Sequence, residues 1–170
     1  MLKSYANIEA MKHVYYGLIY SKIEYCISSW GGCCVSRLSP IIKLQKKAIR
    51  LICNKPYIEP THNLFIKMKM LKLVDIFKLK ICTLVQHVKN NNIVGDLLIR
   101  PLSHTHKHFT RLQKRNNFYI PSSNTNLGKT SFNYLAPKMW QEVPEHIKNI
   151  NSNRFKFQLK KYFIKLYDND

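Results

Sequence analysis

Acidic residues are scarce in this chain of 170 residues: nine Asp and Glu stand against 28 Lys and Arg, and the formal net charge is +19. An excess of this size creates a field that attracts polyanions, of which nucleic acid is the first candidate. The shortage of carboxylates also argues against two-metal phosphoryl transfer, which needs them to bridge the ions. No Tyr-x-Asp-Asp turn occurs, and the only closely spaced aspartates, Asp168 and Asp170, end the chain. We therefore predict that this chain is not itself a polymerase or a nuclease.

Long apolar runs are also missing. No stretch approaches the ~20 apolar residues that span a bilayer, and "MLKSYANIEAMKH" lacks the apolar core and cleavage site of a signal peptide. The odd number of cysteines, without a pairing pattern, is typical of a reducing compartment. These are Cys26, Cys33, Cys34, Cys53 and Cys82. We expect no membrane partner and an intracellular location, in the nucleus or the cytoplasm.

Catalytic and metal-binding signatures are likewise scarce. The sequence contains no phosphate-binding loop, no Gly-x-Ser-x-Gly elbow and no His-Glu-x-x-His helix. In "HTHKHFTR", His104, His106 and His108 would point to one side of an extended segment, as zinc or copper ligands can. Because no Cys, Asp or Glu lies nearby to complete the set, we predict no metal and no cofactor. A polar loop or strand that brings Arg111 near phosphate is the favoured interpretation.

The spacing of apolar residues predicts a mainly α fold. Helical periodicity runs through residues 8–26, 39–53, 61–70 and 74–89, so residues 1–92 are expected to form a small bundle of three or four helices. Residues 97–141 contain no acidic residue and are expected to form loops and short extended segments. The chain is predicted to end in an amphipathic helix that begins near Ser152. Residues 93–170 thus form a second, basic segment in this prediction.

The helix at 39–53 has two faces. Ser39 is its expected N-cap and Pro40 its expected first residue. Its apolar residues occupy one broad arc: Ile41, Ile42, Leu44, Ala48, Ile49, Leu51 and Ile52. The opposite side carries four cations: Lys43, Lys46, Lys47 and Arg50. Since no carboxylate relieves their mutual repulsion, we predict that they contact phosphate, the alternative being an ordinary solvated face.

Two further groups are candidates for nucleic-acid contact. Downstream basic residues are predicted phosphate contacts: Arg111, Lys114 and Arg115. Phe118 and Tyr119 follow them in "RNNFYIP", an interleaving of aromatic and basic residues that favours base stacking.

Trp140, by contrast, is expected in the core because it lies beside Met139 and between two prolines. Pro137 is expected in the first turn of a short helix and Pro144 at the start of another. Glu142 and Glu145 are expected to serve helix ends or an ion pair with the basic C-terminal helix.

The order of motifs resembles a known family. It runs "VYYGLIYSKIEYCISSWGG", "LSPIIKLQKKAIRLI", "THNLFIKMKMLKLVDIFKLKICTLV", "HKHFTR", "YLAPKMWQEVPEHIK" and "FKFQLKKYF". This series is similar to the C-terminal region of reverse transcriptases of non-LTR retrotransposons, of the jockey and related LINE-type groups. Arg50, Arg111, Trp30, Trp140 and Pro144 match recurrent family positions. The family commonly has Trp-Asn and Leu-Pro where this chain has Trp-Gln and Val-Pro.

The resemblance implies a thumb-like bundle and the segment after it, which help to hold template and primer. The parent family is an RNA-directed DNA polymerase whose endonuclease and catalytic palm are not found in this sequence. The expected partners are RNA or DNA and the missing polymerase domain. A rival interpretation is a remnant that has no function or that serves protein interaction by packing on that domain, which a second apolar stripe at Phe157 and Ile164 favours.

Overall fold

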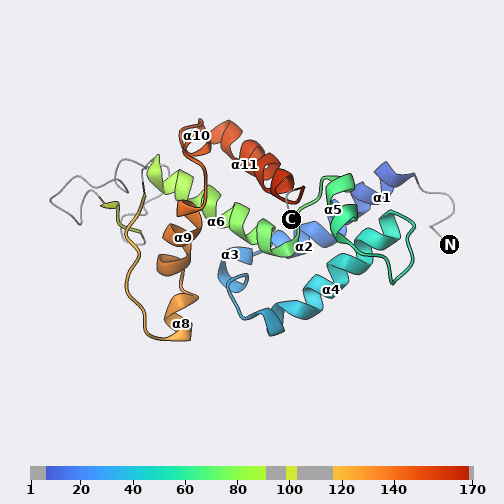
Figure 1. Cartoon of the computed structure of the whole chain (residues 1–170), viewed down its shortest axis with the longest axis horizontal. Helices are drawn as coiled ribbons and strands as arrows, with labels where there is room; N and C mark the ends of the chain where they lie inside the picture. The colour runs from blue at the N-terminus through green and yellow to red at the C-terminus, as the bar shows by residue number, and fades with distance from the viewer. Residues whose placement is uncertain (1–6, 91–98, 103–116, 169–170) are drawn as a thin grey trace. The chain divides into compact units, whose positions relative to one another are not determined.

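The computed structural model describes residues 7–90, 99–102 and 117–168, and it is mainly helical, as predicted (Figure 1). The only β pairing among these residues is an isolated bridge between Pro101 and Phe118. The elements in chain order are α1 (Ile8–Val14), the π-helix η2 (Tyr15–Tyr20), α2 (Ser21–Glu24), α3 (Ile27–Trp30), α4 (Val35–Ile52), α5 (His62–Met68), α6 (Leu73–Lys89), α8 (Asn126–Lys129), α9 (Phe132–Gln141), α10 (Glu145–Lys148) and α11 (Ser152–Leu166).

The chain divides into two compact units. The first comprises Met1–Phe77 together with Tyr162–Asp170, and the second comprises Lys78–Lys161. The predicted boundary after residue 92 does not coincide with this division, because both α6 and α11 carry residues of each unit.

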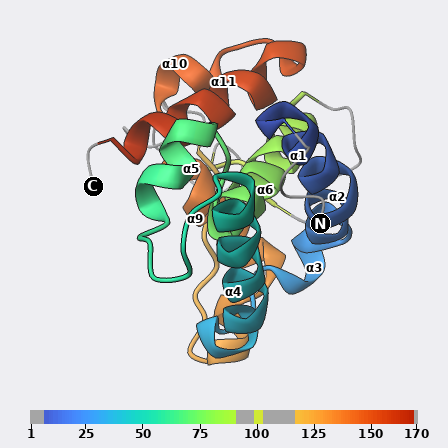
Figure 2. The same ribbon diagram turned by 90° about the vertical axis from the view of Figure 1, so that its right-hand side faces the viewer.

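In the first unit, α4 lies between the N-terminal helices and α5 (Figure 2). The buried face of α4 repeats every three or four residues, which gives one stripe that packs against its neighbours. The core cluster consists of Tyr15, Ala48, Ile49, Ile52, Leu64, Phe65, Met68, Met70 and Tyr167. Tyr167 belongs to it because its hydroxyl accepts a hydrogen bond from the Lys72 amide at 3.1 Å and donates one to Asp75.

Gln45 is the polar centre of this unit and is 2% exposed. Its amide nitrogen donates to the Tyr15 hydroxyl and to the Leu71 carbonyl, each at 3.0 Å. Its amide oxygen accepts from the Leu73 backbone N–H at 2.9 Å. Both of its donor hydrogens are therefore used, as a buried amide requires. One side chain from α4 thus fixes η2 and the start of α6.

The N-terminal helices form the helical run predicted for residues 8–26, with a π-helix at its middle. The rings of Tyr15 and Tyr16 meet edge to face at a centroid distance of 5.4 Å, and Tyr16 contacts Tyr20 at 5.3 Å. The run ends at Glu24, and Cys26, with a φ of 49°, then turns the chain into α3. Apolar spacing of three and four residues predicts an α-helix and did not predict the π-helix, whose hydrogen bonds span five residues.

Two predicted helix starts are wrong in the same way. Pro40 and Pro137 both lie inside helices, which begin five residues earlier at Val35 and Phe132. Each helix lacks one backbone hydrogen bond at its proline, because proline has no backbone N–H. The preceding turns still form, since Leu38 N–H bonds the Cys34 carbonyl at 3.3 Å and Leu135 N–H bonds the Ser131 carbonyl at 3.0 Å.

The second unit is built around Trp140, which is fully buried as predicted. Its ring lies 6.2 Å from that of Phe118 and 5.8 Å from that of Phe155.

Pro144 precedes α10 and Glu145 lies in its first turn, as expected. Glu142 instead pairs with Lys78 of α6, at 3.0 Å, and not with the C-terminal helix. The short helix expected around Trp140 forms as α9, and α8 is a further helix within the stretch that was expected to be rich in loops.

The Gln45 network generates a test of what holds the first unit together. Replacing Gln45 by Leu keeps a similar volume but leaves the Tyr15 hydroxyl, the Leu71 carbonyl and the Leu73 N–H without their partner. At about 1–3 kcal/mol for a buried unsatisfied group, we expect a loss of about 3 kcal/mol in the free energy of unfolding, measured by urea denaturation. Tyr15→Phe removes one bond and should cost about 1 kcal/mol.

The matched control is Lys46→Gln, one position along the same helix on its exposed side. It should change stability by less than about 0.5 kcal/mol. Equal effects of Gln45→Leu and Lys46→Gln would show that the network does not organise this unit.

Candidate nucleic-acid interface

Three of the four predicted α4 cations form an exposed group. Lys43, Lys46 and Lys47 are all exposed and lie on the side of α4 away from Ile49 and Ile52. Within the described part of the chain, no carboxylate lies within ion-pair distance of these three lysines. We call these three residues the lysine face. Their positive charge is not neutralised by neighbouring side chains, so an anion from outside can do so.

Arg50 differs from these lysines, because the protein itself uses its guanidinium. Its Nε donates to the Glu59 carbonyl at 2.8 Å, and its Cζ lies 5.4 Å from the centre of the Tyr57 ring. Both partners belong to the loop that follows α4. Arg50 therefore helps to fix this loop through its Nε, and its predicted phosphate contact stays a prediction.

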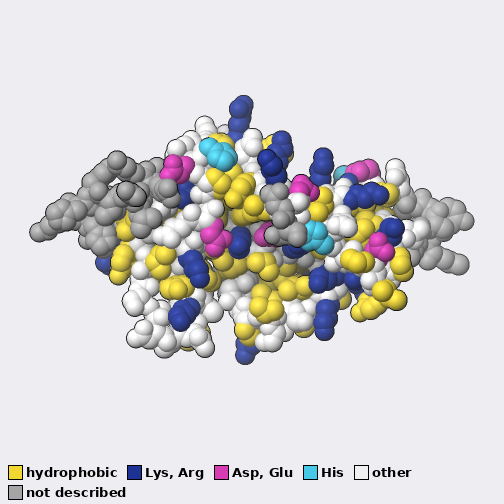
Figure 3. Space-filling model, viewed as in Figure 1, with side chains coloured by type: hydrophobic (Ala, Val, Ile, Leu, Met, Phe, Trp, Pro, Cys, Tyr) yellow, Lys and Arg dark blue, Asp and Glu magenta, His cyan; other side chains and the backbone are white. Residues whose placement is uncertain are grey.

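On the face that Figure 3 shows, the described basic side chains are spread out. In Figure 3, Lys and Arg side chains are scattered across the face shown, between apolar side chains, and are not gathered into one patch. The predicted contacts Arg111, Lys114 and Arg115 lie outside the described residues, as do the metal candidates His104, His106 and His108. The lysine face is thus the only one of the predicted basic clusters that the structure places.

The two aromatic candidates for base stacking, Phe118 and Tyr119, differ in exposure. Phe118 is 5% exposed and packs edge-on against Trp140, so its ring belongs to the core of the second unit and not to a stacking surface. Its burial follows from the bridge to Pro101 and the hydrogen bond from the Tyr119 N–H to the Arg100 carbonyl at 2.8 Å, which fix the alternation of inward and outward side chains. Tyr119 points the other way and is 38% exposed. The stacking prediction stays with Tyr119 alone.

The cysteines are all free thiols, and they differ in pKa. The hydrogen bond between Cys34 Sγ and Ser36 Oγ, 3.2 Å long, lowers the pKa of the Cys34 thiol. Burial raises the pKa of Cys82 to about 12. Among the described residues, no three His, Cys, Asp or Glu side chains are grouped closely enough to hold a metal ion.

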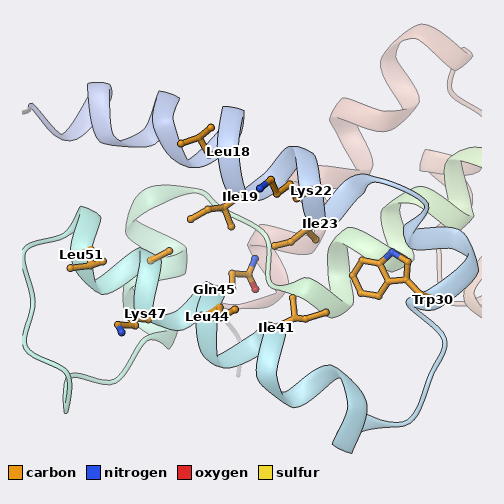
Figure 4. Close-up of a pocket in the computed structure, with 11 residues that line it drawn as sticks. Leu18, Ile19, Lys22, Ile23, Trp30, Ile41, Leu44, Gln45, Lys47 and Leu51 are labelled. Atoms are coloured by element: carbon orange, nitrogen blue, oxygen red, sulfur yellow. The ribbon is translucent and has the colours of Figure 1, made fainter.

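Sequence reasoning missed an apolar groove beside the lysine face. Leu44 and Leu51 were placed in the inward arc, yet they are 64% and 46% exposed. They border a groove of about 580 Å³ between α4 and the N-terminal helices (Figure 4). The arc assigned to the core was too broad, because on a helix only the residues around Gln45, Ala48, Ile49 and Ile52 reach it.

No protein-family model, curated protein or solved structure significantly matches the chain. The resemblance to reverse transcriptases therefore rests on the motifs of the sequence itself. In the described ranges, no helix is both long enough and apolar enough to cross a bilayer.

The different roles of Arg50 and Lys46 generate a stability test. Arg50→Ala removes the hydrogen bond to the Glu59 carbonyl and the contact with the Tyr57 ring. We expect it to lower the free energy of unfolding by about 1–2 kcal/mol. Lys46→Ala, the exposed control on the same helix, should be neutral within about 0.5 kcal/mol. Neutral results for both substitutions would contradict the role of Arg50 in fixing this loop.

The thiol pKa values generate a second test. Since the thiolate is the nucleophile, Cys34 should react with iodoacetamide at neutral pH at least about tenfold faster than Cys82, as mass spectrometry of the modified peptides would measure. Ser36→Ala removes the hydrogen bond that lowers the pKa of Cys34, so it should slow alkylation of Cys34 at a fixed pH and leave Cys82 unchanged. A Cys34 rate that ignores this substitution would contradict the assignment.

Proposed function

We propose that this chain binds RNA or DNA through the phosphate backbone, with Lys43, Lys46 and Lys47 of α4 as the principal contacts. The observation that carries the proposal is the lysine face: three exposed cations on one rigid helix, with no carboxylate of the described residues to neutralise them. The net charge of +19 supports the same partner, because it steers polyanions toward the surface.

The geometry of a helix suits this task. Lys43 and Lys47 are four residues apart, which corresponds to a rise of about 6 Å along α4. Phosphates of one strand of a duplex are spaced at about 3.4 Å along its axis, so the two ammonium groups can reach phosphates about two steps apart. The side chains are long and flexible, and no base edge needs to be read. Binding of this kind depends on the backbone and only slightly on sequence.

The family context of this proposal is a reverse transcriptase. The chain would be the thumb and post-polymerase region of a non-LTR retrotransposon enzyme of the jockey or LINE type, a non-catalytic piece of an RNA-directed DNA polymerase that contacts template and primer. The order of six motifs supports this assignment. Arg111, Lys114 and Arg115, in "HKHFTR" and just after it, remain proposed contacts of the same kind, and binding would take place in the nucleus or the cytoplasm.

A second candidate function is a protein-interaction region that packs on the polymerase domain of the parent enzyme. Phe157 favours it, because this residue is 57% exposed on α11, where Nζ of Lys161 lies 4.5 Å from the centre of its ring. Ile164, the other member of the predicted second stripe, is partly buried. Aggregation of the isolated chain that is relieved by adding the polymerase domain would support this candidate.

The proposed function is tested by charge reversal with a matched control. We expect the triple variant Lys43→Glu, Lys46→Glu and Lys47→Glu to weaken binding of a fluorescein-labelled single-stranded RNA of about 20 nucleotides at least about tenfold, measured by fluorescence anisotropy. The slope of log affinity against log salt should fall by about three, one for each lost phosphate contact. A DNA of the same sequence should respond alike, since both ligands present phosphates.

The control variant reverses three exposed lysines elsewhere: Lys67, Lys129 and Lys138. It carries the same net charge as the α4 variant, so it removes the same long-range attraction but leaves the lysine face intact. We expect its affinity to fall less than about threefold. Equal losses in the two variants, or binding that is independent of salt, would contradict a specific role of α4.

A further inference from the structure

The apolar groove beside the lysine face has the form of a docking site for a helix. One wall comes from the N-terminal helices and the other from α4. In Figure 4, Ile19 and Ile23 project toward α4, Ile41 projects back toward them, and Trp30 closes one end. All of these residues lie in the first unit. The groove has a volume of about 580 Å³, within the range of about 300–1,000 Å³ that ligand-binding clefts occupy.

The rim of the groove carries exposed apolar side chains. Leu18 is 62% exposed and Leu44 64% exposed, one on each wall, and Leu51 extends the α4 side of the rim to the end of the helix. Single exposed leucines are common on protein surfaces. Here one exposed leucine on the N-terminal wall and two on α4 border a single apolar hollow, and a contiguous apolar surface of this kind marks binding sites. An apolar occupant that covers these leucines would therefore remove their apolar surface from water, which favours binding.

The polar atoms of the groove restrict the charge of that occupant. Gln45 forms part of the floor, but both of its donor hydrogens and its oxygen are already bonded inside the first unit. The indole N–H of Trp30 donates to the Tyr25 carbonyl at 2.9 Å. The charged groups among the lining residues are Lys22 and Lys47, one on each wall, and no carboxylate lines the groove. Water solvates both exposed lysines in the free chain, and an acidic group on an occupant can form an ion pair with either of them.

The length of the groove matches a short helix. On α4 the lining residues run from Ile41 to Leu51, eleven residues that span a rise of about 15 Å. A docked helix of the same length presents about three apolar anchors at the i, i+3 or i+4, and i+7 positions. Two walls that are themselves helices provide ridges and grooves for such packing.

We propose that this groove binds an amphipathic helix of another protein, with leucine-like anchors at helical spacing and Glu or Asp along its flanks. The anchors fill the hollow between Leu18 and Leu44, and the acidic flanks pair with Lys22 and Lys47. A second copy of this chain is disfavoured as the occupant, because two chains of net charge +19 repel each other. The site goes beyond the proposed nucleic-acid binding and does not depend on it, since Lys43 and Lys46 are not among the lining residues.

The test uses the full chain and a synthetic helical peptide of about 16 residues, with Leu at spacings of three and four and Glu at the flanking positions. A scrambled peptide of the same composition keeps the charge but destroys the apolar stripe. We expect saturable binding of the helical peptide, at least about tenfold tighter than that of the scrambled one, measured by isothermal titration calorimetry. A third peptide with Lys in place of Glu should bind at least about tenfold more weakly.

Variants of the groove separate this site from the lysine face. Leu44→Gln with Leu51→Gln changes no charge and keeps good helix formers at exposed positions, so it should fold normally and weaken the helical peptide at least about tenfold. Its affinity for RNA should stay unchanged. Lys43→Glu with Lys46→Glu should do the opposite, weakening RNA and leaving the peptide within about threefold. These opposite outcomes distinguish a failure of this proposal from a failure of the proposed function.

Three results would overturn the proposal. Equal binding of the helical and scrambled peptides would mean that the peptide follows net charge alone. Peptide binding that ignores Leu44→Gln with Leu51→Gln would place the peptide elsewhere. Self-association of the chain in analytical ultracentrifugation that disappears in the same double variant would show that a second copy occupies the groove.

Discussion

The hydrogen bonds of Gln45 are the constraint on which the first unit depends. A buried amide with its donors and oxygen all paired accepts one geometry only, because any rotation of α4 or displacement of Leu71 or Leu73 leaves a polar group unsatisfied in the core. The apolar packing of Ile49 and Ile52, which belong to α4, would by itself tolerate a small rotation of this helix. The amide network removes that freedom, and it thereby determines which residues of α4 face outward.

The outward side of α4 carries two different surfaces, and their arrangement follows from the period of the helix. At 100° per residue, Lys46, Lys43 and Lys47 occupy one sector, and Leu51 and Leu44 occupy the next before the buried stripe begins. The lysine face offers charge that a phosphate backbone can neutralise, and the leucines border a groove that an apolar ridge can fill. Lys47 belongs to both, since it lines the groove as well. We therefore propose that one fixed helix supports two adjoining binding surfaces, which share Lys47.

Much of the helical content could be predicted from apolar periodicity, because the spacing in segments such as 8–26 and 74–89 is regular. The burial of Trp140 beside Met and Pro also followed from residue type. Periodicity failed at finer points. It treated every apolar residue of α4 as inward, although Gln45 in the middle of the arc marked the true centre of the buried face. Proline rules placed helix starts at Pro40 and Pro137, while upstream turns extended both helices. Nothing local distinguishes Phe118 from Tyr119, whose opposite exposures depend on pairing with residues 100–102.

The most direct measurement is a nuclear magnetic resonance titration of the ¹⁵N-labelled chain with a short single-stranded RNA and with the acidic helical peptide, first separately and then together. Two surfaces on one helix predict that RNA perturbs the signals of Lys43 and Lys46, that the peptide perturbs those of Leu18 and Leu51, and that each ligand still binds when the other is saturating. Perturbation of the same residues by both ligands, with mutual displacement, would contradict the account, because it would mean a single general site for polyanions.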